Sequence, residues 1–144
     1  MDAVVLTNFF HQHAKYAVLA LEKGIHVLSE TMPAVTMADC VAICRASEKS
    51  GAIYMLAENY PYMLFNQEMK RVYETGNIGK VMYAEGEYNH PVAPTDEKFI
   101  LKYRPYEEHW RNYLPRTYYI THSLGPVMCA TGATPKIVTA FAAF

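Results

Sequence analysis

The sequence has few of the features that mark secreted, membrane-spanning or nucleic-acid-binding proteins. It has 3 cysteines and no CxxC pair, too few for a disulfide framework. Its 13 basic residues are balanced by 14 acidic ones, which leaves no basic stripe to collect phosphates. No apolar run approaches the roughly 20 residues of a membrane span, and no charged region precedes the first apolar segment. We therefore expect a cytoplasmic protein with no nucleic-acid or membrane partner.

The sequence also lacks a glycine-rich phosphate-binding turn. Its 7 glycines are isolated, and none forms GxGxxG, the turn whose backbone amides hold a dinucleotide pyrophosphate at a helix N-terminus. The composition is nevertheless that of a folded chain, with 51% hydrophobic and 19% charged residues. A chain of 144 residues is long enough for roughly one domain with its own core.

The first part of the chain alternates short apolar strands with amphipathic helices. The predicted strands cover 3–7, 26–29 and 53–57, and the predicted helices cover 11–23 and 36–51. This alternation, with its short connections, predicts a parallel sheet with right-handed crossovers. We therefore predict an α/β fold in which residues 1–60 form the C-terminal half of a Rossmann sheet, a partial NAD(P)-binding domain.

Residues 61–144 are predicted to begin an α+β domain for substrate binding and oligomerisation. A helix ending at Gly76 is expected to place its apolar residues on one side: Tyr62, Phe65, Met69, Val72 and Tyr73. Further predicted elements are an alternating strand over 80–90, a long polar loop over 91–113, a helix from about Thr121 and a strand over 136–141.

Two of the cysteines lie close together in a predicted helix. Cys40 and Cys44 are four residues apart, so they would share a helical face, which could suit a metal. Together with Met37 and Val41, however, they follow the spacing of a buried stripe, and a free cysteine packs as a small hydrophobe. We therefore interpret both as core residues and expect no metal site.

A family resemblance runs along most of the chain. The ordered segments 2–7, His13-Ala14, 20–24 and 26–30 resemble the Gfo/Idh/MocA oxidoreductases. The likeness continues in Asn77-Ile78-Gly79-Lys80-Val81, in Gly86-Glu87-Tyr88, and in His122 followed by Gly132. The resemblance implies a nicotinamide cofactor and a sugar-like substrate, with this chain lacking the N-terminal GxGxxG half.

Two departures from the general pattern direct the comparison to one branch of that superfamily. Thr31 stands where the family has a lysine, and Tyr118 stands where it has an aspartate. The chain is similar to the family-109 glycosidases in Glu30 with Pro33-Ala34-Val35-Thr36, in Glu58-Asn59-Tyr60, and in residues 119–126. That resemblance implies an NAD-dependent mechanism in which transient oxidation of the sugar ring allows the glycosidic oxygen to leave by elimination.

The candidate catalytic residues are His122 and Tyr119. An imidazole can take a hydroxyl proton near neutral pH as a hydride leaves the carbon, and Tyr119 could share that proton. Candidate substrate residues are Glu58, at the end of a parallel strand, and Tyr88, Trp110 and Arg111. Structural alternatives remain open: His122 and Glu58 could cap helices, the tyrosines could only pack, and Trp110 could anchor an interface.

The candidate cofactor-binding residues are Thr7, Asn8, His13 and Glu30, which the resemblance and the ends of the predicted strands place near a nicotinamide or its ribose. Glu30 could instead be a simple surface charge. Without the phosphate turn, binding of NAD or NADP by this chain is expected to be weak or absent.

The leading interpretation is an NAD(P)-dependent sugar oxidoreductase with His122 as acid/base. The first alternative is an NAD-dependent glycoside hydrolase. The second is a catalytically inactive truncated relative that acts only by association. Half a sheet leaves strand edges without their usual neighbours, so we also expect a homo-oligomer.

Overall fold

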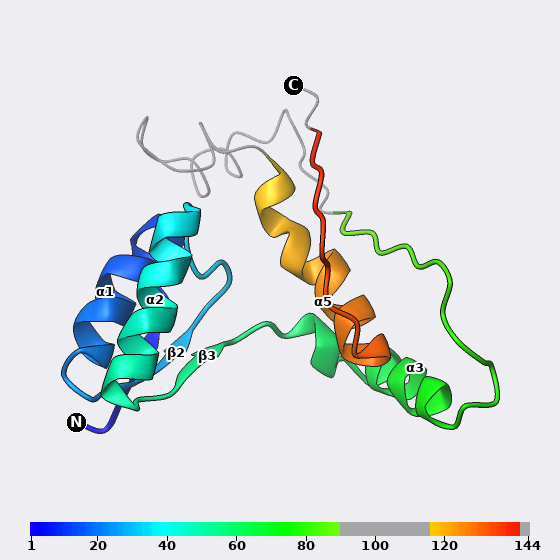
Figure 1. Ribbon diagram of the computed structural model, residues 1–144, viewed down its shortest axis with the longest axis horizontal. Coiled ribbons are helices and arrows are strands. Elements are labelled where there is room, and N and C mark those ends of the chain that lie inside the picture. The colour runs from blue at the N-terminus through cyan, green and yellow to red at the C-terminus, as the bar shows by residue number, and fades with distance from the viewer. Residues whose placement is uncertain (90–115, 142–144) are drawn as a thin grey trace, which may run out of the picture. The chain divides into compact units, whose positions relative to one another are not determined.

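The computed structural model describes residues 1–89 and 116–141, in two compact units, Met1–Glu58 and Asn59–Phe144 (Figure 1). Each unit is described by itself. Among the described residues, no helix is long and apolar enough to cross a membrane.

The first unit is built on a three-stranded parallel sheet. Its strands are β1 (Ala3–Leu6), β2 (His26–Ser29) and β3 (Tyr54–Leu56), in the order β1-β2-β3. The register pairs Leu6 with Ser29 and Ser29 with Leu56, so all three strands end at the same edge. The predicted fold class, the second half of a Rossmann sheet, is confirmed by this topology.

Two helices pack on this sheet and supply most of its core (Figure 1). A 3₁₀ turn, η1 (Phe10–Gln12), leads into α1 (His13–Leu21), and α2 (Met37–Ser50) follows β2. One side of α1 is buried: Ala17 and Leu21 have no exposed surface, and Ala14 is nearly covered. Small alanines let the helix backbone lie close to its neighbours, and α1 packs directly against α2.

The two ends of α2 follow from their sequence. The Thr36 hydroxyl accepts a hydrogen bond from the Asp39 backbone N–H at 3.1 Å and donates to the Asp39 carboxylate at 2.7 Å. Such an N-cap stabilises a helix by about 1 kcal/mol. Gly51 ends the helix in the left-handed conformation, at φ 69°, which suits a residue without a side chain.

The predicted buried stripe of α2 is wrong. The core residues of α2 are Ile43 and Ala46, whereas Cys44 is exposed and Met37 retains 78% of its surface. The buried residues Ile43 and Ala46 lie on one side of the helix, and the predicted stripe lies on another. Both sets have the spacing of a helical face, so spacing alone does not decide which one is buried. Cys40 is half-buried, and burial raises the pKa of its thiol. The described part of the chain holds no group of His, Cys, Asp and Glu suited to a metal ion.

The second unit contains two packed helices. A turn, η2 (Tyr60–Tyr62), precedes α3 (Leu64–Glu74), and η4 (Arg116–Tyr119) precedes α5 (Ile120–Thr131), which packs against α3. Amide side chains fix the first turn of α3: Asn66 Nδ2 donates to the Tyr60 carbonyl at 2.7 Å, and Gln67 Nε2 donates to the Pro61 carbonyl at 2.6 Å.

The face of α3 predicted to be buried is largely exposed. Phe65 and Met69 retain 65% and 51% of their surface, while Asn66 is buried. Hydrogen bonding of Asn66 to η2 therefore decides which side of this helix faces inward, and apolar periodicity does not.

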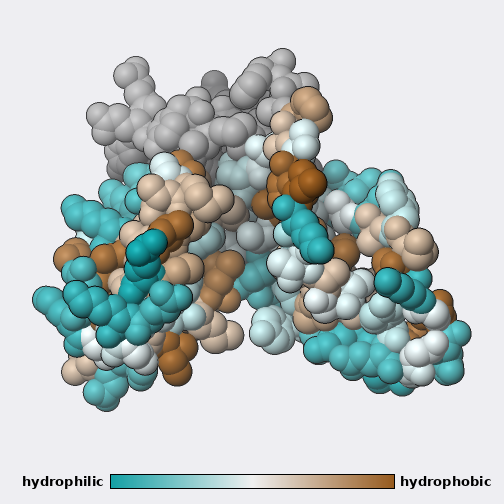
Figure 2. Space-filling model, in the orientation of Figure 1, coloured by the Kyte–Doolittle hydropathy of each residue, from teal (hydrophilic) through white to brown (hydrophobic). Residues whose placement is uncertain are grey.

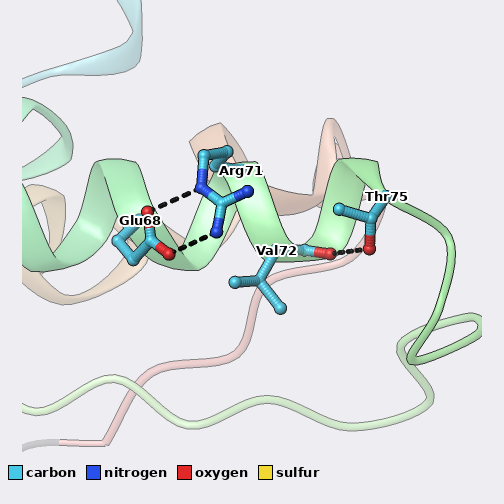
Figure 3. A network of polar contacts seen from close by, with 4 residues as sticks. All are labelled: Glu68, Arg71, Val72 and Thr75. Atoms are coloured by element: carbon cyan, nitrogen blue, oxygen red, sulfur yellow. Dashed lines mark hydrogen bonds and ion pairs between the residues drawn. The ribbon is translucent and has the colours of Figure 1, made fainter.

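One part of the exposed surface of α3 is polar. Figure 2 shows hydrophilic residues along α3 and over α2. In Figure 3, the Arg71 guanidinium donates to both carboxylate oxygens of Glu68, at 2.8 and 2.6 Å, and the Thr75 hydroxyl donates to the Val72 carbonyl. The hydrogen bond from Arg71 holds the pKa of the Glu68 carboxyl below its usual value. Because the pair is exposed, it contributes little to stability.

The strands predicted over 80–90 and 136–141 are not formed in the described residues. Residues 80–89 and 136–141 have no strand assignment. Alternating side chains give a segment the potential to form a strand, but a strand needs a hydrogen-bonding neighbour, and the described residues supply none here.

One edge of the first unit is open within the described part of the chain, where β1 pairs only with β2. The Asp2 carbonyl accepts a hydrogen bond from the backbone N–H of His26 in β2. The Leu6 carbonyl accepts one from the backbone N–H of Glu30, which directly follows β2. Backbone groups alternate along a strand, so Val4 also faces β2, whereas the N–H of Val5 points to the outer edge. Exposed edges of this kind pair readily with another chain.

We predict that the chain self-associates through this outer edge of β1. Val5→Pro removes an outward N–H without removing a bond to β2, so it should shift the sedimentation profile towards monomer while the circular dichroism spectrum is kept. Val4→Pro is the matched control, because it removes an inward donor and should destabilise the fold. A wild-type chain that stays monomeric over a wide concentration range would contradict the prediction.

Candidate functional site

In the first unit, three predicted cofactor residues lie at the carboxyl edge of the sheet. Thr7 and Asn8 follow β1, Glu30 follows β2, and all three are exposed. The Glu30 N–H donates to the Leu6 carbonyl at 2.9 Å, which extends the ladder to the strand ends and sets Glu30 beside Thr7. Open α/β sheets bind their ligands in the crevice outside this edge.

The fourth predicted cofactor residue, His13, is placed differently. It begins α1 and has no exposed surface. Its Nδ1 lies 2.8 Å from the Met32 carbonyl oxygen, and its Nε2 lies 2.8 Å from the Asn8 carbonyl oxygen. Its side chain therefore offers no surface for contact with a cofactor in this structure.

The predicted substrate residues are divided. Glu58 follows β3 at the end of the first unit and keeps 9% of its surface. Tyr88 lies in the second unit with the predicted catalytic pair. Trp110 and Arg111 lie outside the described residues.

Four rings of the second unit form one cluster, which we call the aromatic cluster: Tyr60, Tyr88, Tyr119 and His122. The His122 imidazole stacks on the Tyr60 ring, with centroids 4.3 Å apart and planes at 16°. Tyr88 meets His122 nearly edge-on at 4.7 Å, and Tyr119 lies tilted at 4.8 Å. Tyr88 also contacts both Tyr60 and Tyr119, at 5.5 and 5.2 Å. Three tyrosines thus enclose the imidazole, which is only 8% exposed.

The sequence of α5 explains where His122 stands. Tyr119 is the residue before α5, and His122 follows in the first turn of the helix, so both rings rise from one end of it. Pro126 lies inside α5 and has no N–H to donate to the carbonyl four residues earlier, which is that of His122. The ring contacts, each worth about 0.5–1.5 kcal/mol beyond simple burial, then define the orientation of the imidazole.

Gly86 lets Tyr88 reach this cluster. An added Cβ at Gly86 would overlap with the Ser123 carbonyl oxygen and lie 2.9 Å from its carbonyl carbon. The extended segment therefore passes against the backbone of α5 itself. The space left by the missing side chain of Gly86 is therefore filled by the backbone of α5 and is not open to a ligand.

Sequence reasoning missed Tyr60 as a member of the cluster. Its position in Glu58-Asn59-Tyr60, a segment that carries the family resemblance, was the available signal. Contact with His122, more than 60 residues later, could not be read from spacing.

Known proteins resemble this chain both in sequence and in structure. No family model matches the chain. Glycosyl hydrolase family 109 protein 2 of Phocaeicola vulgatus is 30% identical over 88% of the chain, and family 109 protein 1 of Bacteroides fragilis is also 30% identical over 88%. The chain spans 32% and 26% of these relatives.

The chain is a homologue of the family-109 glycosyl hydrolases. Among solved structures, an oxidoreductase from Sinorhizobium meliloti matches 56% of the chain at 30% identity and a TM-score of 0.53, with 23% of that protein covered. The WlbA dehydrogenase from Bordetella pertussis, in complex with NADH and UDP-GlcNAcA, matches 55% at 25% identity and a TM-score of 0.53, again with 23% covered. The resemblance to Gfo/Idh/MocA-type dehydrogenases is thereby confirmed.

The described residues fit only one end of a nicotinamide cofactor. Thr7, Asn8 and Glu30 offer hydroxyl, amide and carboxylate groups at the sheet edge, which suit the nicotinamide and its ribose. The turn before α1 contains Phe9 and Phe10 and has no glycine, so it provides no cradle for a pyrophosphate.

We predict that Gly86→Ala separates Tyr88 from His122. The added methyl group meets a backbone carbonyl that cannot turn away, so the segment must move, at a cost of about 1–3 kcal/mol in unfolding free energy. Denaturant titration measures the loss, and the proton signals of the His122 ring should move towards those of free imidazole. Ala84→Ser, at an exposed position of the same segment, is the control. An unchanged His122 spectrum in folded Gly86→Ala would contradict the prediction.

Proposed function

We propose that this chain carries part of the active site of an NAD(P)-dependent oxidoreductase that acts on a sugar or sugar derivative. The observation that supports it most is the aromatic cluster, in which three tyrosines hold one imidazole. Aromatic faces can contact the C–H faces of a sugar, while phenol hydroxyls and an imidazole can engage its hydroxyl groups.

His122 is the proposed acid/base. In the oxidation step, a hydroxyl group of the sugar gives its proton to the imidazole. A hydride leaves the carbon that bears this hydroxyl group, which becomes a carbonyl group. A bound NAD(P) supplies the hydride acceptor. Tyr119, which precedes α5 and contacts the His122 ring at 4.8 Å, orients the hydroxyl or shares its proton. Positioned proton transfer of this kind typically contributes about 10²–10⁴-fold to a rate.

The second candidate function is NAD-dependent glycoside hydrolysis, which the two family-109 relatives favour. Here the first step is the same oxidation. The new carbonyl acidifies the proton on the neighbouring carbon, so that the glycosidic oxygen leaves by elimination, and addition of water and return of the hydride complete the cycle. This path needs a second base for the carbon-bound proton. Tyr88, in contact with both His122 and Tyr119, is the residue we propose for that place.

A third candidate is association without catalysis. The open edge of β1 favours it, since a chain of this kind could pair with another sheet without using the aromatic cluster. Binding of a sugar at the cluster separates this candidate from the first two.

We predict weak or absent binding of NAD and NADP by this chain. The contacts that Thr7, Asn8 and Glu30 can offer engage one end of the cofactor, whereas association costs roughly 4–15 kcal/mol in lost freedom. Titration calorimetry with each nucleotide should therefore show no saturable micromolar binding. Micromolar binding would show that the chain, alone or as an oligomer, holds the pyrophosphate in a way that these residues do not explain.

We also predict that the aromatic cluster binds a sugar without the cofactor. Titration with myo-inositol and with a methyl N-acetylhexosaminide should shift the His122 ring signals saturably in nuclear magnetic resonance spectra. Tyr119→Phe keeps the ring but removes the hydroxyl, so it should weaken the binding. Tyr16→Phe is the control, because Tyr16 is an exposed residue of the first unit. If the cluster is formed and neither sugar moves the His122 signals, the proposed function fails.

A further inference from the structure

His13 joins two loops that are far apart in sequence. Asn8 belongs to the loop between β1 and α1, and Met32 belongs to the loop between β2 and α2. The His13 ring reaches the carbonyl of one with Nε2 and the carbonyl of the other with Nδ1, both at 2.8 Å. The two contacts span 5 and 19 residues of sequence.

The chemistry of this contact is specific to an imidazole. A carbonyl oxygen only accepts hydrogen bonds, and each ring nitrogen can donate only when it carries a proton. No other side chain presents two nitrogen atoms on opposite edges of one rigid ring. A buried polar ring left without these partners would lose its hydrogen bonds and regain none from water, so the ring and both loops hold one another in place.

The loops joined in this way carry the proposed cofactor residues. Asn8 is itself one of them and follows Thr7 directly, while Glu30 lies two residues before Met32. The hydrogen bond from Glu30 to Leu6 fixes where the two loops leave the sheet, and His13 contacts both loops beyond that point, at Asn8 and Met32. Direct contact between His13 and a ligand is not needed for this effect.

We propose that His13 is a positioning residue that fastens the β1–α1 loop to the β2–α2 loop at the carboxyl edge of the sheet. The fastening itself does not rest on the proposed function. Its consequence for a cofactor does, because the ligand at this edge is part of that proposal. The test below needs no cofactor, so failure of one is distinguishable from failure of the other.

The experiment follows the carbonyl carbons of Asn8 and Met32 in the full chain. Pro33 follows Met32 and has no amide proton, so carbon-detected spectra are required. His13→Leu removes both contacts and should move both carbonyl signals, in the direction of a lost hydrogen bond for each carbonyl that a protonated ring nitrogen meets. His13→Gln keeps one amide donor and should restore one signal.

Leu21→Ala is the matched control. Leu21 also has no exposed surface and lies in α1, but its side chain makes no hydrogen bond. It should lower stability without moving the two carbonyl signals. If folded His13→Leu leaves both signals in place, or if Leu21→Ala moves them as much, His13 is an ordinary core residue and the proposal is wrong.

A measurement on the unchanged chain covers the case in which His13→Leu does not fold. A buried ring N–H that donates to a carbonyl exchanges slowly with solvent and shows a through-space contact to the loop that it holds. At least one such ring N–H proton should be observed, with contacts to the segment that its nitrogen faces, Met32 for Nδ1 or Asn8 for Nε2. Rapid exchange of every ring N–H proton of His13 in the folded chain would overturn the proposal.

Discussion

Parallel pairing is the constraint on which the first unit depends. Because β1, β2 and β3 run in the same direction, each connection must cross back over the sheet, and α1 and α2 occupy those crossings. The same pairing brings the strand ends to one edge, where the loops must turn without strand partners. Their carbonyl groups need other donors, and His13 lies where it can meet two of them.

Close approach of backbones plays the corresponding part in the second unit. The aromatic cluster requires Tyr88, from an extended segment, to meet His122, from α5. That contact exists because Gly86 lets the segment lie against the carbonyl of Ser123. A glycine is needed here because any side chain would occupy the space of the helix backbone. Tyr60 is brought to the same place by η2, whose carbonyl at Tyr60 is held by Asn66.

The elements of the first unit were predictable because their patterns are local. Alternation of short apolar runs with helical spacing predicts β1, α1, β2, α2 and β3 in order, and the cap residues Thr36 and Gly51 lie where α2 begins and ends. The face that α2 buries was not predictable from spacing, since residues on two sides satisfy the same periodicity. For α3, the decisive interaction is a hydrogen bond from a polar residue, Asn66, which a search for apolar stripes passes over. Strand formation over 80–89 failed as a prediction because a ladder depends on a neighbour that local sequence does not specify.

The candidate site was predictable in its composition but not in its geometry. The family resemblance brought His122, Tyr119 and Tyr88 forward by motif, and the structure adds that their rings touch and that Tyr60 completes the set. His13 was also a candidate because of a family motif, but its ring is buried between two loops. Both of its nitrogens face backbone oxygens at 2.8 Å, whereas the ring contacts of His122 are with three tyrosine rings. Proton transfer needs a nitrogen that can change its partner during the reaction, and loop positioning needs nitrogens whose partners stay the same. Fixed backbone partners on both nitrogens therefore suit His13 to a structural bridge between the two loops, and they set it apart from a histidine that must exchange a proton with a substrate.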